Sequence, residues 1–297
     1  MTVLAIDVGG TKLEAALVDP EGRIVPGSRS RAATGRETEP RDLQRLLADA
    51  VGRTLGTATD AVTGVGIGSA GPVDRRAGRI SPVNMPQLAG FAVRETLEAL
   101  VPGVPVALAL DGQCIALAET RFGAARDAHS TLGMVVSTGV GGGLVLDGRL
   151  IPGATGNAGH VGQMHTAELD EHGRPLTVEA VASGPASVAW ARERGWEGTT
   201  GEELAAGWAR GDAVPRDAVL RSARAVGALV ADVWTLADLE VVVIGGGFSH
   251  VAPEYPELVT KAAAERAELD YARAPRVVRA ALGHDAPLVG AAALALA

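Results

Sequence analysis

The sequence predicts an α/β protein made of two related halves, and three observations support this prediction. The chain has 297 residues, and at about 150 residues per domain this length suggests two domains. Short apolar runs of strand length alternate with segments whose apolar residues fall at helical spacing, which is the pattern of α/β folds. A group of three strands with a glycine turn occurs at the start of the chain and again in its middle.

The first half is expected to hold five strands and three helices. The strands are apolar runs bounded by Gly, Pro or Asp, at residues 3–8, 13–18, from 23–25 onward, 62–67 and 104–110. The polar residues 27–40 predict a loop. Leucine and alanine at spacings of three and four residues predict a helix over 40–55, and further helices are expected at 93–100 and about 113–122.

The second half begins with the same order of strand, glycine turn, strand, turn and strand. These strands are expected at residues 132–136, 144–147 and 150–151. A helix-rich stretch follows over about 178–237, and a strongly apolar strand at 239–244 runs into three glycines. A helix at about 256–268, a strand at 277–281 and an apolar helix at 287–297 complete the pattern.

The composition excludes several classes of function. The net charge of −8 argues against sequence-independent binding to nucleic acid, which needs a basic surface. The lone cysteine, Cys114, can form neither an internal disulfide nor a cysteine-rich zinc site, and it fits a reducing compartment. Because the chain shows neither a membrane-spanning apolar run nor a secretory signal, we expect a cytoplasmic protein that does not bind membranes.

Three glycine turns, each after an apolar strand, are candidates for binding phosphate. They are DVGGTK at 7–12, STGVGGG at 137–143 and GGG at 245–247. Backbone N–H groups can surround a polyphosphate only where no Cβ blocks the approach, and Thr or Ser adds hydroxyl donors. Neither of the first two is a P-loop or a GxGxxG fingerprint. A single such turn is more often a plain hairpin, but three in equivalent places favour a phosphate site.

Two carboxylates stand where apolar strands end. Asp7 interrupts the apolar run of the first strand, and it predicts either a Mg²⁺ ligand acting through water or a hydrogen-bonded turn carboxylate. Asp111 follows the strand at 104–110, at an edge where α/β folds place their clefts. It predicts either a general base for a substrate hydroxyl or an N-cap for the helix at 113–122.

These residues resemble the ROK family of sugar kinases, within the actin-like ATPase superfamily. The resemblance covers nearly the whole chain and combines several motifs, of which the first two glycine turns are specific together. The others are GSAGPVD at 68–74, DGQ at 111–113, GNAGHVGQ at 156–163, Glu179 before ASGPA at 182–186, VVVIGGG at 241–247 and the ending DAPLVGAAALAL.

The resemblance implies two RNase-H-like domains that flank a cleft. The smaller would comprise residues 1–112 plus 286–297, and the larger residues 113–285. It also implies a homodimer that transfers the γ-phosphoryl group of ATP, with Mg²⁺, to a hexose, with glucose at O6 as the first expectation. The alternatives are an amino sugar or N-acetylhexosamine, fructose or mannose, and, less expected, a non-catalytic sugar-binding or regulatory protein. A regulator would carry a winged helix before the first strand, so we expect an enzyme.

By the same resemblance each site residue has an implied role. Asp111 would be the general base, and Asp7 would hold Mg²⁺ through water. The residues implied to bind the sugar are Gly71, Asn84, His160, Gln163 and Glu179. Those implied to bind the nucleotide are Asp7, Gly9, Gly10, Thr11, Lys12, Thr138, Gly139, Gly141, Gly246 and Gly247. The turn at 245–247 favours a nucleotide over polyphosphate as the donor.

The chain departs from the family pattern at four places. Leu110 stands where the family often has a sugar-binding Asn, and His160 where it often has Glu. Gln163 replaces a His that is a zinc ligand in many members, and the CxCGxxGC cluster is missing. We therefore expect no structural zinc, with Asp170 and His172 merely solvated on a polar loop. The replaced sugar contacts leave the acceptor sugar open.

Overall fold

The computed structural model describes residues 1–272 and 276–296 as two five-stranded sheets of the same topology. In the first sheet the order is β3-β2-β1-β4-β7, and in the second it is β10-β9-β8-β13-β14. The first sheet comprises β1 (Thr2–Val8), β2 (Lys12–Val18), β3 (Ser30–Ala33), β4 (Val62–Ser69) and β7 (Val106–Leu110). The second comprises β8 (Thr131–Val136), β9 (Val140–Leu146), β10 (Arg149–Leu150), β13 (Val241–Gly245) and β14 (Val277–Arg279).

Strand direction is also repeated between the sheets. In each one an antiparallel meander of three strands is followed by two parallel strands, because β1 pairs in parallel with β4 and β8 with β13. Parallel strands need a crossover, and helices supply it. This arrangement confirms the predicted α/β fold of two related halves.

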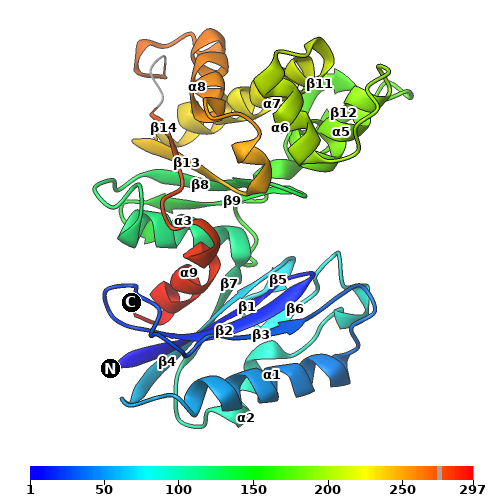
Figure 1. The fold of residues 1–297 in the computed structure, drawn as a ribbon. Helices are drawn as coiled ribbons and strands as arrows, with labels where there is room; N and C mark the ends of the chain where they lie inside the picture. Colours follow the sequence, from blue (N-terminus) through cyan, green and yellow to red (C-terminus); the bar gives the residue numbers. More distant parts are fainter. Residues whose placement is uncertain (273–275, 297) are drawn as a thin grey trace.

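The first sheet is covered on both faces, since its strands alternate their apolar side chains. Leu4, Ile6 and Val8 face α1 (Pro40–Leu55) and α2 (Val93–Leu100), and the opposite residues of β1 face α9 (Ala286–Ala295). In Figure 1, α9 and α3 (Asp111–Phe122) lie stacked between the two sheets. Asp7 belongs to the face of β1 that looks toward α9, which places it in this central layer.

The far face of the second sheet carries the other helices. They are α4 (Val178–Ala182), α5 (Gly184–Arg192), α6 (Gly201–Arg210), α7 (Ala213–Ala237) and α8 (Tyr255–Arg266). Two hairpins stand apart from the sheets, β5 (Val73–Asp74) with β6 (Arg79–Ile80) and β11 (His165–Leu169) with β12 (Pro175–Thr177). Within the described residues no helix is long and apolar enough to cross a bilayer.

Two predicted elements were wrong. The third strand does not begin at 23–25, where Ile24 makes only an isolated bridge to Val18; it is β3, inside the expected loop. Glycines 141–143 are not a turn but part of β9, because they pair with β8; Gly143 also lies so close to α3 that a Cβ there would fall 2.6 Å from Gln113 Cα. Ala297, the last residue of the predicted terminal helix, lies outside the described residues, and the domain limits stay a prediction.

Candidate active site

Asp7 and Asp111 lie at the carboxyl ends of β1 and β7, on either side of β4. Asp7 is 5% exposed. Burial, and then the charge of Asp111, raise the pKa of Asp7 to about 7, while Lys12 lowers it. Burial also raises the pKa of Asp111, and the Gly112 N–H and the His160 ring oppose that change. Because two carboxylates compete to stay charged in one buried place, a cation or a transferable proton is favoured there.

Asp111 is the first residue of α3 rather than its N-cap. The helix starts one position after Leu110, and Asp111 Oδ1 accepts a hydrogen bond from Gly112 N at 2.7 Å. Within the described part of the chain the other oxygen, Oδ2, accepts no hydrogen bond, so it is available to a substrate donor. Capping of a helix at 113–122, the alternative reading of this residue, does not describe its position.

His160 and Gly71 lie together beside Asp111. A Cβ on Gly71 would be 3.1 Å from His160 Nε2 and 2.4 Å from Leu110 Cδ2. His160 Nδ1 lies 2.9 Å from the carbonyl oxygen of Asn157. A carbonyl only accepts, so Nδ1 carries a proton, and Nε2 faces Gly71. Gly71 follows the first sheet and His160 the second, so this pair spans the two halves.

Two side chains that the sequence did not single out hold the His160 loop in place. Gln113 Nε2 donates to the carbonyl oxygens of Gly156, at 3.1 Å, and Ala158, at 2.8 Å. Asn157 bonds both the N–H and the carbonyl of Val73, at 2.8 and 2.7 Å. Gln113 falls inside the DGQ motif and Asn157 inside GNAGHVGQ, so position in a motif was the available signal.

Glu179 and Gln163 lie at the second glycine turn. Glu179 Oε2 accepts a hydrogen bond from Val140 N at 2.9 Å, and Gln163 Nε2 donates to Oε1 at 3.4 Å. A Cβ on Gly139 would lie 2.6 Å from Glu179 Oε2, so a side chain there would displace this carboxylate from its present position. The side chain that stands in place of a family zinc ligand thus bonds the neighbouring carboxylate.

The first glycine turn is closed by Gly9 N, which donates to Lys12 O at 2.9 Å. Thr34 Oγ1 donates to Gly9 O at 2.7 Å and steadies the turn from the end of β3. Asn84 covers it, since a Cβ on Gly10 would lie 2.0 Å from Asn84 Nδ2. Asn84 is therefore placed at the predicted phosphate turn, and Thr11 is exposed on it.

A cavity of about 650 Å³ lies beyond the second turn and brings Thr138 together with Gly247. Gly246 leads into it with φ +93°, and a Cβ there would lie 2.5 Å from Val136 O. No motif in the sequence pointed to the polar side chains that line the cavity from elsewhere in the chain. They are Arg192, Thr199, Thr200, Glu202 and His250. Gly141, by contrast, lies within β9.

Two sheets of one topology, with a carboxylate pair and glycine turns in the layer between them, define a two-domain protein of the actin-like ATPase fold. Residues 3–297 match the ROK family. The chain belongs to this family, and it is a sugar kinase of that family.

Known proteins resemble the chain over its full length. An N-acetylmannosamine kinase of Salmonella arizonae is 38% identical over 305 residues, which cover 99% of this chain and 98% of that protein. The ROK hexokinase of Thermus thermophilus is 35% identical with a TM-score of 0.85, covering 99% of this chain and 97% of that one. A ROK glucokinase of Streptomyces griseus, in complex with glucose and AMPPNP, is 28% identical with a TM-score of 0.81 and 98% coverage of both chains.

Proposed function

We propose that the protein transfers the γ-phosphoryl group of ATP to a hydroxyl of an N-acetylated hexosamine, with N-acetylmannosamine as the first candidate. The observation that carries this choice is 35–38% identity, over 99% of the chain, to N-acetylmannosamine kinases. Glucose was the first expectation from the sequence, and it becomes the second candidate. The similarity to the hexokinase and the glucokinase described above supports glucose as that second candidate.

Asp111 is the proposed general base. Its raised pKa suits it to take the proton of a sugar hydroxyl, and its free carboxylate oxygen can accept that hydrogen bond. His160 Nε2 would accept a second hydroxyl and so fix the sugar beside the base. Gly71 leaves room for this, because any side chain there would meet both His160 and Leu110. Glu179 and Gln163 are proposed to reach the sugar from the second half.

The nucleotide is proposed to lie across the two glycine turns. Thr138 and Gly247 line the 650 Å³ cavity, which suits the adenosine, and Gly139 follows Thr138 in the second turn, where it would meet the α- and β-phosphates. Gly9, Gly10, Thr11 and Lys12 would meet the terminal phosphates at the first turn. Phosphoryl transfer needs positioning and charge stabilisation more than covalent chemistry, and both turns supply backbone N–H groups for it.

Asp7 fits the role of holding Mg²⁺ through water. It is a buried carboxylate whose charge is opposed by Asp111 and Glu14, so a divalent cation would relieve this repulsion. Among the described residues no three potential metal ligands converge, which suits an ion that keeps most of its water shell. When bound, Mg²⁺ would neutralise charge on the triphosphate. A homodimer in the cytoplasm stays a prediction.

The test of this function combines a substrate screen with one variant. Purified protein is assayed with ATP, and with polyphosphate, over glucose, mannose, fructose and their amino and N-acetyl derivatives. N-acetylmannosamine with ATP is expected to have the highest kcat/KM. Asp111→Ala should keep sugar affinity within about tenfold and lose about 10³-fold or more in kcat, since it removes the base. Near-normal turnover of that variant would reject the assignment.

A further inference from the structure

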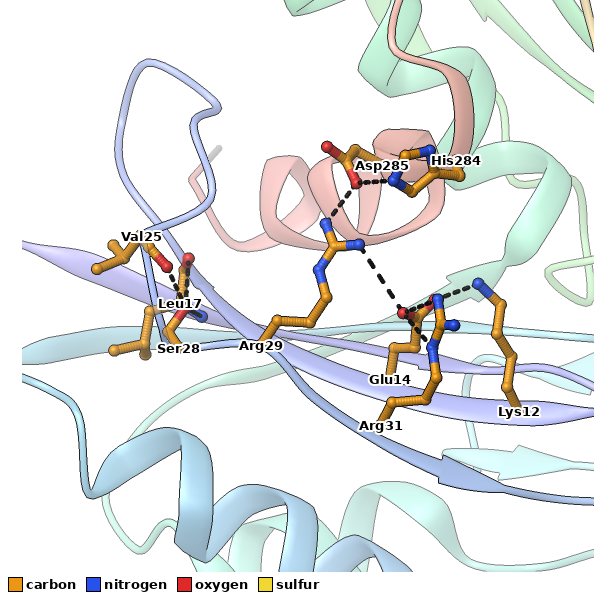
Figure 2. Close-up of polar contacts among 9 residues, drawn as sticks. All are labelled: Lys12, Glu14, Leu17, Val25, Ser28, Arg29, Arg31, His284 and Asp285. Atoms are coloured by element: carbon orange, nitrogen blue, oxygen red, sulfur yellow. Dashed lines mark hydrogen bonds and ion pairs between the residues drawn. The ribbon is translucent and has the colours of Figure 1, made fainter.

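A buried carboxylate beside the first glycine turn has no part in the function described so far. Glu14 of β2 is 1% exposed. The strand register places it directly between Asp7 of β1 and Arg31 of β3, in one row across the sheet. Lys12 lies two residues earlier on the same face of β2. Figure 2 shows Lys12 and Arg31 turned toward Glu14.

Glu14 is held by cations on several sides. The Lys12 ammonium donates to Oε2, and Arg31 donates to Oε1 from Nε at 3.0 Å and from Nη2 at 2.7 Å. Arg29 Nη1 lies 3.9 Å from Oε1. Burial alone would raise the pKa of Glu14, but the hydrogen bonds from Lys12 and Arg31 outweigh it and hold the pKa below its ordinary value. Glu14 is therefore a charged acceptor at all physiological pH values.

Arg29, the third cation near Glu14, is held by Asp285. Its Nη2 pairs with Asp285, which stands just before α9, and His284 Nε2 lies 3.3 Å from the same carboxylate oxygen. Figure 2 shows Asp285 and His284 above the sheet, with Arg29 reaching from the sheet toward Asp285. Arg29 and Arg31 are each held by a carboxylate. Lys12 lies at the edge of the first glycine turn, so of the cations around Glu14 it is the one nearest to the proposed phosphates.

Lys12 has two carboxylates within electrostatic reach. Its charge acts on Asp7 as well as on Glu14, but its hydrogen bond goes to Glu14. A lysine has four side-chain torsions and loses much rotamer freedom when held. If Glu14 did not hold it, Lys12 would move freely or pair with Asp7, where the proposed function needs a carboxylate open to Mg²⁺.

We propose that Glu14 is a positioning residue that holds the Lys12 ammonium at the first glycine turn, directs it to the triphosphate and keeps it off Asp7. The proposal rests on the proposed function for the identity of the triphosphate. Glu14 itself touches neither nucleotide nor sugar. Apart from its direct charge effect on Asp7, its effect should pass through Lys12, and the experiment measures that part.

The test is a double-mutant cycle on nucleotide affinity, with Glu14→Gln, Lys12→Met and the double variant. The dissociation constant for AMPPNP with Mg²⁺ is measured by calorimetry, and KM and kcat are measured with ATP. Glu14→Gln is expected to weaken AMPPNP binding and raise the KM for ATP about five- to twentyfold. The kcat should change less than about threefold. In the Lys12→Met background the same substitution should change affinity less than about twofold.

Controls separate positioning from loss of structure. Glu14→Asp keeps the charge, so it is expected to recover part of the affinity that Glu14→Gln loses. Glu21→Gln removes an exposed carboxylate that pairs with Arg23 on a surface turn, and it should change nothing. Thermal unfolding confirms that each variant is folded. Additive effects of Glu14→Gln and Lys12→Met, or unchanged AMPPNP affinity in Glu14→Gln, would overturn the proposal.

The two proposals fail in different ways. If the wild-type protein binds AMPPNP but phosphorylates no sugar, the proposed function is wrong, and the cycle in dissociation constants still decides the role of Glu14. If the wild-type protein does not bind AMPPNP, both are wrong. If it phosphorylates a sugar and the cycle is additive, only the role of Glu14 is wrong.

Discussion

Asp7 lowers the stability of the folded protein at neutral pH, although its carboxylate is well suited to a bound cation. Its pKa rises from 3.8 to about 7 on folding. Between these two values the folded protein binds a proton that the unfolded chain has lost, so stability falls as the pH rises through this window. The destabilisation is complete above about pH 7 and absent below about pH 4.

Replacing Asp7 with Asn should therefore stabilise the metal-free protein in a pH-dependent way. The gain in the free energy of unfolding should be about 2 kcal/mol larger at pH 7.5 than at pH 5, because one pKa unit corresponds to about 1.4 kcal/mol. Urea unfolding at the two pH values, without Mg²⁺, measures it. A gain that is equal at both values, or larger at pH 5, would contradict the raised pKa.

His160 should matter for the sugar and not for the nucleotide. Nδ1 is bonded to the carbonyl oxygen of Asn157 and Nε2 faces Gly71, so His160→Ala removes one hydrogen-bonding group from the proposed sugar site. We expect the KM for the sugar to rise about tenfold, which is the value of a hydrogen bond of roughly 1.5 kcal/mol, with the KM for ATP unchanged. His165→Ala, an exposed histidine on β11, is the matched control. Equal effects of the two substitutions would remove His160 from the site.

At the scale of elements, glycines let α9 approach its neighbours on both sides. A Cβ on Gly290 of α9 would lie 1.8 Å from Cys114 O in α3, and a Cβ on Gly66 of β4 would lie 1.7 Å from Ala291 O in α9. Backbone atoms cannot yield at these distances. The layer that carries Asp7 and Asp111 therefore depends on residues that have no side chain.

Gly290→Ala should destabilise the protein by about 3 kcal/mol or more, since it overpacks a contact between backbones. Gly52→Ala is the control, because Gly52 lies in α1 with nothing within 4 Å of the added Cβ. That substitution should be neutral or stabilise by up to about 1 kcal/mol. Chemical denaturation of both variants compares them, and a Gly290→Ala protein as stable as wild type would contradict the close packing of α9.

The contrast between predicted and observed elements has a physical cause. β1, β7 and α1 could be predicted because each has an apolar pattern of its own, and Asp7 and Asp111 stood out against such patterns. β3 could not be predicted, because Ser30–Ala33 is short and polar. Its position depends on pairing with β2 and on the hydrogen bonds from Arg31 to Glu14. Glycines 141–143 look like a turn in the sequence, and only their pairing with β8 makes them part of a strand.

At the scale of the whole molecule, both proposed ligands bridge the two halves. Gly71 and Asp111 follow strands of the first sheet, whereas His160 and Glu179 belong to segments that follow strands of the second. The nucleotide would likewise touch the turn after β1 and the cavity beyond β8. The first sheet ends with β7 at Leu110, where α3 begins, and Glu119 of α3 accepts hydrogen bonds from Ala281 N and Leu282 N, at 3.1 and 2.9 Å, shortly before α9.

Each ligand should therefore strengthen the binding of the other. A sugar that draws the halves together brings the two glycine turns into range of one triphosphate, and the nucleotide does the same for the sugar site. We expect saturating sugar to lower the dissociation constant for AMPPNP by about 5- to 100-fold, and AMPPNP to lower that for the sugar by the same factor, because coupling in binding is reciprocal. Calorimetry in both orders measures the two factors. His160→Ala should reduce both together, and affinities that do not depend on the other ligand would show that the halves do not close on their substrates.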